Sequence, residues 1–169
     1  MYFIELFSEK SDQVRLVTFL LSALLAVSVL LINQYINTKR NKRDLLLSKI
    51  EDLYKSSIEY TNLCTEILDD VQHQNVDYPS VKKEHRREVQ NILRKMEMLC
   101  GLYFPDSGFD TTDYRLWNME VLEYLEKGKH SEEGEMHCMW EDARQHIVNS
   151  DAKLAVICSN LMKSHGYKK

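Results

Sequence analysis

Apolar residues follow two patterns in this chain, one continuous and one periodic. The continuous pattern is a run of 17 residues without a charge, Leu16 to Ile32. A helix of that length covers about 26 Å, and the addition of Asn33 to Ile36 extends it across a hydrocarbon core about 30 Å thick. The run therefore predicts a transmembrane helix over residues 14–36. Residues 1–13 are expected to form a short extracytoplasmic or interfacial segment.

The periodic pattern begins after residue 43, where apolar or small residues recur at alternating steps of four and three, as on one face of a helix. The first such stripe comprises Leu46, Ile50, Leu53, Ser57, Tyr60, Cys64, Ile67 and Val71. A second stripe, with Ser80 as its expected N-cap, comprises Val81, Val89, Ile92, Leu93, Met96, Leu99 and Cys100. That helix is expected to end near Gly101 to Pro105.

Two further stripes follow. A short helix is expected through Leu116, Trp117, Met119, Leu122, Leu125 and Glu126, with caps at Thr111, Thr112 or Asp113 and at Gly128. A long one carries Met136, Trp140, Ala143, Ile147, Ser150, Leu154, Ile157 and Leu161. Four stripes are most economically buried in a bundle. The predicted fold is therefore all-α, with one N-terminal transmembrane helix followed by a cytosolic antiparallel four-helix bundle over residues 44–169.

The link between the predicted span and the bundle has two interpretations. No glycine or proline occurs from residue 14 to residue 72, so one helix can run through both parts. Alternatively, the polar side chains from Asn37 to Asn41 break the helix locally by competing for its backbone hydrogen bonds.

Basic residues are concentrated on the C-terminal side of the span, in a juxtamembrane collar at residues 37–43. The collar residues are Lys39, Arg40, Lys42 and Arg43. Only Lys10 and Arg15 lie close to the span on the other side, so the positive-inside bias predicts an external N-terminus and a cytoplasmic C-terminal domain. The lipid bilayer is thus the first expected partner.

The chain after the collar is acidic. Six of the 22 basic and three of the 26 acidic residues precede residue 44, which leaves a net charge of −7 for residues 44–169. That charge disfavours nucleic acid as a partner. Five glycines in the whole chain leave little material for a phosphate-binding loop, and no catalytic motif is present. We therefore expect neither an enzyme, nor a cofactor, nor a small-molecule substrate.

Two groups of residues are candidates for binding. The first is a basic cluster on the opening turns of the second bundle helix, comprising Lys82, Lys83, Arg86 and Arg87. Cations are unfavourable near the positive end of a helix, and an acidic partner would compensate them. The alternative is a solvated face in which Glu84 and Glu88 form local pairs. The second group, Ser22, Ala23 and Ala26, is a strip of small residues that would allow close packing of two transmembrane helices.

The histidines and cysteines give weaker signals. His130, His137 and His146 lie near several carboxylates, but no Glu-x-x-His occurs, and a surface pair of Asp142 with His146 is the simpler interpretation. The cysteines all follow the span: Cys64, Cys100, Cys138 and Cys158. Their spacing fits no zinc motif, so we expect buried, reduced thiols and no metal.

Two short motifs carry a resemblance. The segment Lys49-Ile50-Glu51-Asp52-Leu53-Tyr54 and the segment Leu102-Tyr103-Phe104-Pro105 resemble patterns in uncharacterised small bacterial single-span membrane proteins. The resemblance extends from the collar to about Pro105 and implies no activity. It implies a bacterial inner-membrane setting.

These features predict a membrane-anchored helical interaction module that acts as an anchor, an adaptor or a signal-transmitting component. Its partner would be another protein or a second copy of the chain. The alternative hypothesis is a membrane-perturbing effector of a bacterial toxin-like or anti-phage defence system, which would act by oligomerisation.

Overall fold

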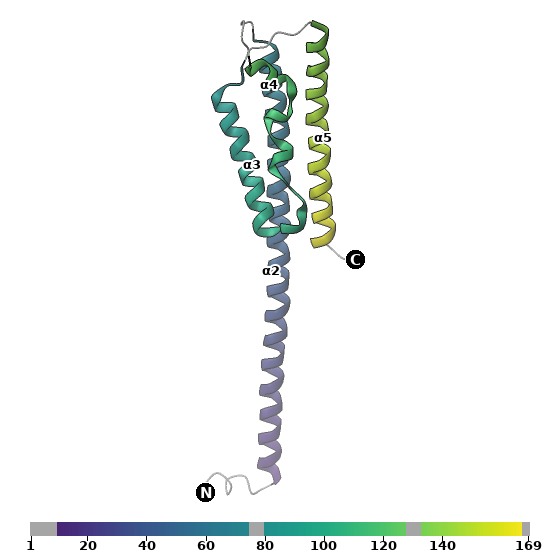
Figure 1. The fold of residues 1–169 in the computed structure, drawn as a ribbon. Coiled ribbons are helices and arrows are strands. Elements are labelled where there is room, and N and C mark those ends of the chain that lie inside the picture. Colours follow the sequence, from purple (N-terminus) through teal and green to yellow (C-terminus); the bar gives the residue numbers. More distant parts are fainter. Residues whose placement is uncertain (1–9, 75–79, 128–132, 167–169) are drawn as a thin grey trace. The chain divides into compact units, whose positions relative to one another are not determined.

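The computed structural model describes residues 10–74, 80–127 and 133–166, and over these residues it is helical with no strand (Figure 1). The α-helices are α2 (Lys10–Gln72), α3 (Lys83–Tyr103), α4 (Glu120–Glu126) and α5 (Glu133–His165). Three 3₁₀ helices join α3 to α4, namely η1 (Pro105–Ser107), η2 (Thr111–Tyr114) and η3 (Leu116–Asn118). The all-helical prediction is confirmed. The chain divides into two compact units, Met1–Asp44 and Leu45–Lys169, and α2 contributes to both.

In the first unit, α2 presents its apolar side chains to the outside. Every large apolar residue from Val14 to Ile36 is exposed, from 39% for Leu16 to 71% for Phe19. Leaving a leucine-sized side chain in water rather than in an apolar medium costs roughly 1.5–3 kcal/mol, so this surface requires a cover. The helix is long and apolar enough to cross a membrane.

The aliphatic hydroxyls of this stretch bond to their own helix. Thr18 donates to the carbonyl of Val14, and Ser22 donates to that of Thr18, each over 2.8 Å. Ser28 donates to the carbonyl of Leu24 over 2.8 Å. A hydroxyl in hydrocarbon is costly without an acceptor, and these bonds supply one without a second chain.

The helix continues through residues 37–41, so the local break considered above is absent. There the amide Nδ2 of Asn37 donates to Oδ1 of Asn33 over 3.3 Å. This side chain bonds another side chain one turn away and does not compete for the backbone.

The second unit is built around one hydrophobic core, to which α2, α3, α4 and α5 all contribute. Every member of the first predicted stripe is buried except Leu46, which is partly buried. The second stripe is buried throughout. On α5 the stripe is also buried, with Met136 and Ile157 partly exposed. The alternating steps of four and three therefore identified the buried faces of the long helices correctly.

The start of α3 differs from the prediction. The helix begins at Lys83, and Lys82 takes the N-cap position without a side-chain cap. Ser80 instead donates its backbone N–H to Oε1 of Gln74 over 3.0 Å, while Gln74 donates Nε2 to the Ser80 carbonyl. Ser80 is thus held to the end of α2 and is not the cap.

The end of α3 follows the prediction. The helix ends at Tyr103, and the N–H of Phe104 bonds the carbonyl of Cys100 over 2.8 Å. Phe104 is buried, with its ring centroid 5.7 Å from that of His165 on α5. Pro105 then opens η1, and Gly108 turns the chain at φ 70°, a value that glycine adopts without strain. The motif around Phe104 and Pro105 therefore closes one end of the core.

The third predicted helix is shorter than expected, because 3₁₀ turns replace its first half. Asp110 caps η2 by accepting the N–H of Thr112 over 2.8 Å, so the predicted caps at Thr111, Thr112 and Asp113 are wrong. Arg115 is extended and separates η2 from η3. Only Glu120–Glu126 forms α4, which packs against α5. Gly128, predicted as the C-terminal cap, lies outside the described residues.

Candidate functional site

The collar residues all lie on α2. Asp44 pairs with two of them, through Nε of Arg40 at 3.9 Å and Nη2 of Arg43 at 3.4 Å. Lys39 and Lys42 are exposed. A polybasic segment beside an anionic leaflet gains about 1 kcal/mol for each cation near the surface, and the ion pairs with Asp44 would offset part of such a gain.

The strip of small residues lies on the exposed surface of α2. Ser22, Ala23 and Ala26 are all exposed, and the Ser22 hydroxyl is already bonded to Thr18. Any close packing along this strip would therefore depend on small side chains and not on a hydrogen bond from Ser22.

The structure divides the predicted basic cluster. Nζ of Lys82 lies 2.7 Å from Oδ2 of Asp70, and this hydrogen bond lowers the pKa of the Asp70 carboxyl. Arg86 is partly buried and donates Nε to the carbonyl of Val81 over 3.2 Å. Lys83 and Arg87 are exposed. The four cations therefore do not form one surface: Lys82 is tied to α2, and Arg86 faces a groove that the sequence did not predict.

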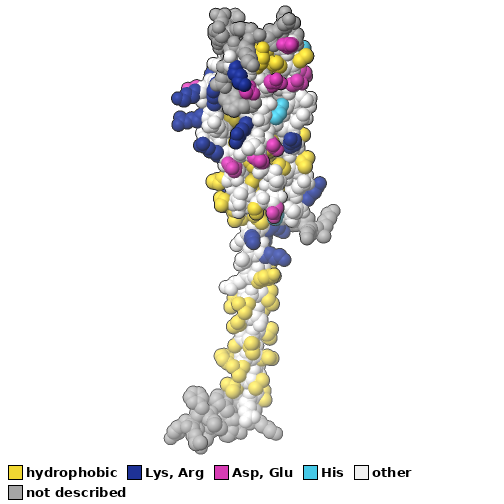
Figure 2. Space-filling model, in the orientation of Figure 1, with side chains coloured by type: hydrophobic (Ala, Val, Ile, Leu, Met, Phe, Trp, Pro, Cys, Tyr) yellow, Lys and Arg dark blue, Asp and Glu magenta, His cyan; other side chains and the backbone are white. Residues whose placement is uncertain are grey.

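This groove, which we call the arginine groove, lies between α3 and the η2–η3 segment and has a volume of about 350 Å³. Three guanidinium groups line it, from Arg86, Arg94 and Arg115, with Glu97 as the acidic member of the lining. The other lining residues are Val89, Gln90, Leu93, Thr111 and Leu116. Figure 2 shows basic side chains gathered over α3. The arginine groove thus combines an apolar floor with a cationic rim.

One wall of the arginine groove is fixed to the core through Tyr114. Its carbonyl accepts the hydroxyl of Tyr60 over 2.6 Å, and the two rings meet edge to face with centroids 6.1 Å apart. The ring of Phe109 also stacks on that of Tyr114, with centroids 5.2 Å apart. The amide of Asn118 also donates to the carbonyl of Thr112 over 2.8 Å. These contacts hold Thr111, Arg115 and Leu116 in place.

The Asp110 carboxyl, next to this wall, is held in its ionised form. The amide and hydroxyl of Thr112 bond the Asp110 carboxylate and lower its pKa, and Arg115 adds a smaller effect of the same sign. Asp110 therefore stays charged beside Arg115. Arg94 is exposed on α3, and no ion pair joins it to another described residue.

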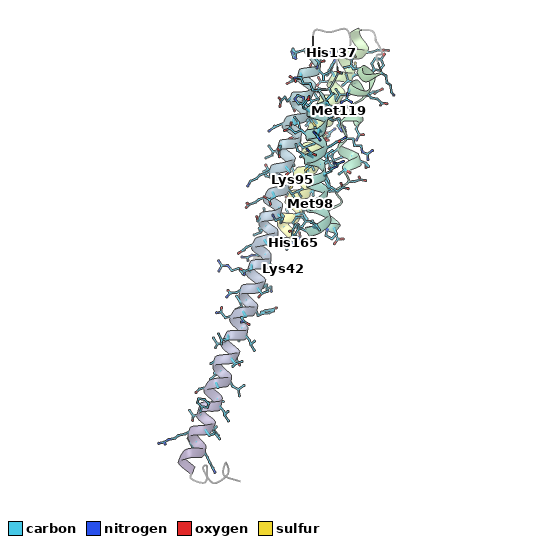
Figure 3. The ribbon with its side chains drawn as sticks, turned by 90° about the vertical axis from the view of Figure 1, so that its left-hand side faces the viewer. Lys42, Lys95, Met98, Met119, His137 and His165 are labelled. Atoms are coloured by element: carbon cyan, nitrogen blue, oxygen red, sulfur yellow. The ribbon has the colours of Figure 1, made fainter. Side chains whose placement is uncertain are left out.

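The histidines do not gather. His137 and His165 lie near opposite ends of α5 (Figure 3), about 42 Å apart along the helix at 1.5 Å per residue. His146 is half-buried without a hydrogen bond to Nε2, and no ion pair joins it to Asp142. The predicted surface pair is therefore wrong. His130 lies outside the described residues, among which no group of His, Cys, Asp and Glu is arranged to hold a metal ion.

Three of the four thiols are buried and one is not. Burial raises the pKa of Cys64 to about 12 and that of Cys158 to about 11, and it also raises the pKa of Cys100. Such thiols stay protonated and unreactive near neutral pH. Cys138 on α5 is exposed, so the expectation that all four are buried is wrong for this residue.

The arginine groove contains two basic residues that the sequence did not predict as part of a binding site, Arg94 and Arg115. A signal for the first was present, because Arg86, Gln90 and Arg94 follow one another at steps of four and share a helix face. No signal existed for Arg115, since its approach to α3 depends on the 3₁₀ turns of η2 and η3.

No family model, curated protein or solved structure matches the chain. The fold and the surfaces therefore define only a class: a helical protein with one candidate membrane-spanning helix and a folded helical unit beyond it.

Proposed function

We propose that this chain is a single-pass protein of a bacterial inner membrane, with its N-terminus outside and an antiparallel four-helix bundle in the cytosol. The bundle binds another protein, and the chain acts as an anchor, adaptor or signal-transmitting component without catalytic chemistry of its own. The span, the collar and the bundle correspond to residues 14–36, 37–43 and 44–169.

The observation that carries this proposal is the contrast between the two units. The first exposes every large apolar side chain from Val14 to Ile36, whereas the second buries its apolar stripes in a core of its own. A bilayer would cover the apolar surface of the first unit, whereas the second unit buries its apolar stripes in its own core and can fold in water.

The surface of the second unit supports a role in binding. On the face drawn in Figure 2, basic side chains gather over α3, although residues 44–169 carry a net charge of −7. A local reversal of charge on an acidic domain attracts acidic surfaces and repels basic ones, which gives a partner both a rate advantage and an orientation.

The test is the composition of the complex that the full chain forms in its own membranes. We would extract membranes from cells with native expression in a mild non-ionic detergent, measure particle mass by light scattering and identify every co-purifying chain. A second protein at fixed stoichiometry supports the adaptor function.

A particle that contains only this chain would contradict the proposed function and favour the effector hypothesis. The effector hypothesis in turn requires that induced expression collapses the membrane potential, as measured with a potential-sensitive dye. A confirmed, inserted protein with unchanged potential would eliminate it.

A further inference from the structure

The residues that line the arginine groove have a net charge opposite in sign to that of the second unit. Three guanidinium groups and one carboxylate line it, so its rim carries a net charge of +2 within a domain of net charge −7. We propose that the arginine groove binds an acidic peptide segment of a partner protein, one that carries Asp or Glu side chains beside a leucine-sized apolar side chain. This inference rests on the proposed function and names the chemistry of the partner.

The cationic rim accounts for the acidic part of that segment. A guanidinium presents planar donors that match a carboxylate in a two-point hydrogen bond, which a lysine ammonium does not. All three cations of the arginine groove are arginines, while the neighbouring Lys82 and Lys83 do not line it. The lining therefore suits carboxylates more closely than a diffuse basic surface does.

The floor accounts for the apolar part. Val89, Leu93 and Leu116 line the arginine groove, and its volume of about 350 Å³ is within the range of ligand-binding pockets, roughly 300–1,000 Å³. An inorganic anion would leave this floor uncovered. A side chain of leucine size would bury it.

Nucleic acid fits the arginine groove less well. Single-stranded nucleic acid binds through aromatic side chains on which bases stack, and no aromatic residue lines the groove. Glu97 would also repel a run of phosphates, whereas a peptide can place a neutral or donor group beside it.

The arginine groove is preformed on one side, which lowers the entropy that binding must offset. Tyr60, Phe109 and Tyr114 fix the η2–η3 wall, as described above. On the α3 side, Nε of Arg86 is held by the carbonyl of Val81. Preorganisation of this kind increases affinity mainly because less conformational entropy is lost when the ligand binds.

A peptide titration tests the chemistry directly. The probe is a fluorescently labelled peptide of about 12 residues that alternates pairs of Glu with Leu, titrated with the full chain in non-ionic detergent micelles and followed by fluorescence anisotropy. Comparison probes are the same peptide with Lys or Gln in place of Glu, a single-stranded oligonucleotide and inorganic phosphate. We expect saturable binding of the acidic peptide alone.

Two double variants with the same change of charge locate the site. Arg94→Ala with Arg115→Ala removes two groove cations, and we expect affinity to fall about tenfold for each guanidinium lost. Lys83→Ala with Arg87→Ala removes two exposed cations of α3 outside the arginine groove, and we expect less than a threefold loss. Circular dichroism of both variants must match that of the parent.

Several results would overturn the inference. These are no saturable binding of the acidic peptide, tighter binding of the oligonucleotide or of phosphate, or an equal loss in both double variants. A larger loss with Lys83 and Arg87 replaced would place the binding face on the exposed part of the basic cluster instead.

Photo-crosslinking in cells separates this inference from the proposed function. A benzophenone amino acid replaces Gln90, which lines the arginine groove, or Gln145, an exposed residue of α5. We expect a crosslink from position 90 to an Asp- and Glu-rich segment, lost when Arg94 and Arg115 are replaced. A partner crosslinked at position 145 but not at position 90 would contradict the groove as the binding site and would leave the proposed adaptor function unaffected. Crosslinks only to a second copy of the chain, or none at either position, would count against both.

Discussion

The hydrogen bond from Tyr60 to the carbonyl of Tyr114 links the longest helix to the wall of the arginine groove, and Tyr60→Phe tests it. The substitution removes one hydroxyl and keeps the ring, so the edge-to-face contact with Tyr114 is retained. Both residues are buried, with exposures of 1% and 2%. Water therefore cannot replace the lost donor, and the carbonyl is left without this partner.

The cost follows from that burial. A buried acceptor that loses its donor costs about 1–3 kcal/mol, more than the net value of an average hydrogen bond. For a domain of this size, each kcal/mol lowers the unfolding temperature by roughly 4 °C, so a decrease of about 4–12 °C is expected. Burial also raises the pKa of Tyr60 far above its usual range, so its hydroxyl remains a donor throughout the accessible pH range.

The assay is urea or thermal unfolding of the full chain in non-ionic detergent, followed by tryptophan fluorescence. Tyr54→Phe is the matched control, because Tyr54 lies on the same helix with 49% exposure, and its change should stay within about 0.5 kcal/mol. Amide exchange in residues 111–118 should also accelerate in Tyr60→Phe alone. Equal stability and equal exchange in the two variants would refute the idea that this bond fixes the wall.

Three further predictions use the same full-length preparation. Trp140→Ala should cost about 3–5 kcal/mol in unfolding followed by circular dichroism, because the indole is only 8% exposed; a negligible change would mean that it does not support the core. Burial, with Lys153 nearby, lowers the pKa of His146, so the unfolded chain binds its proton more readily and stability should fall as the pH drops below about 6.5. His146→Gln should flatten that dependence and His137→Gln, at an exposed site, should not. A membrane-impermeant maleimide should label Cys138 before the other cysteines in the folded protein. In intact cells it should label Cys138 only after permeabilisation, and labelling without permeabilisation would indicate the orientation opposite to the one proposed.

Periodic signals in the sequence predicted the helices well where packing alone decides the structure. The stripes of α2, α3 and α5 repeat at the helical period over many turns, so each residue supports the assignment of its neighbours. The prediction for the region between Phe104 and Glu120 failed for a specific reason. The burial of Tyr114 and its bond to Tyr60, 54 residues earlier, favour 3₁₀ turns that no local pattern encodes. The arginine groove was not predicted either, because this region forms one of its walls.

The hydroxyls of the apolar stretch bear on the choice between an anchor and a membrane-perturbing effector. Thr18, Ser22 and Ser28 each donate to a carbonyl one turn earlier, so a single helix satisfies them within hydrocarbon. A water-filled path needs polar groups that face water. To form one, several copies of the helix would have to assemble with these hydroxyls turned toward a common centre. An anchor requires neither rearrangement nor assembly. The internal bonding of the candidate span therefore suits the proposed anchor, whereas a pore would require several copies of the helix.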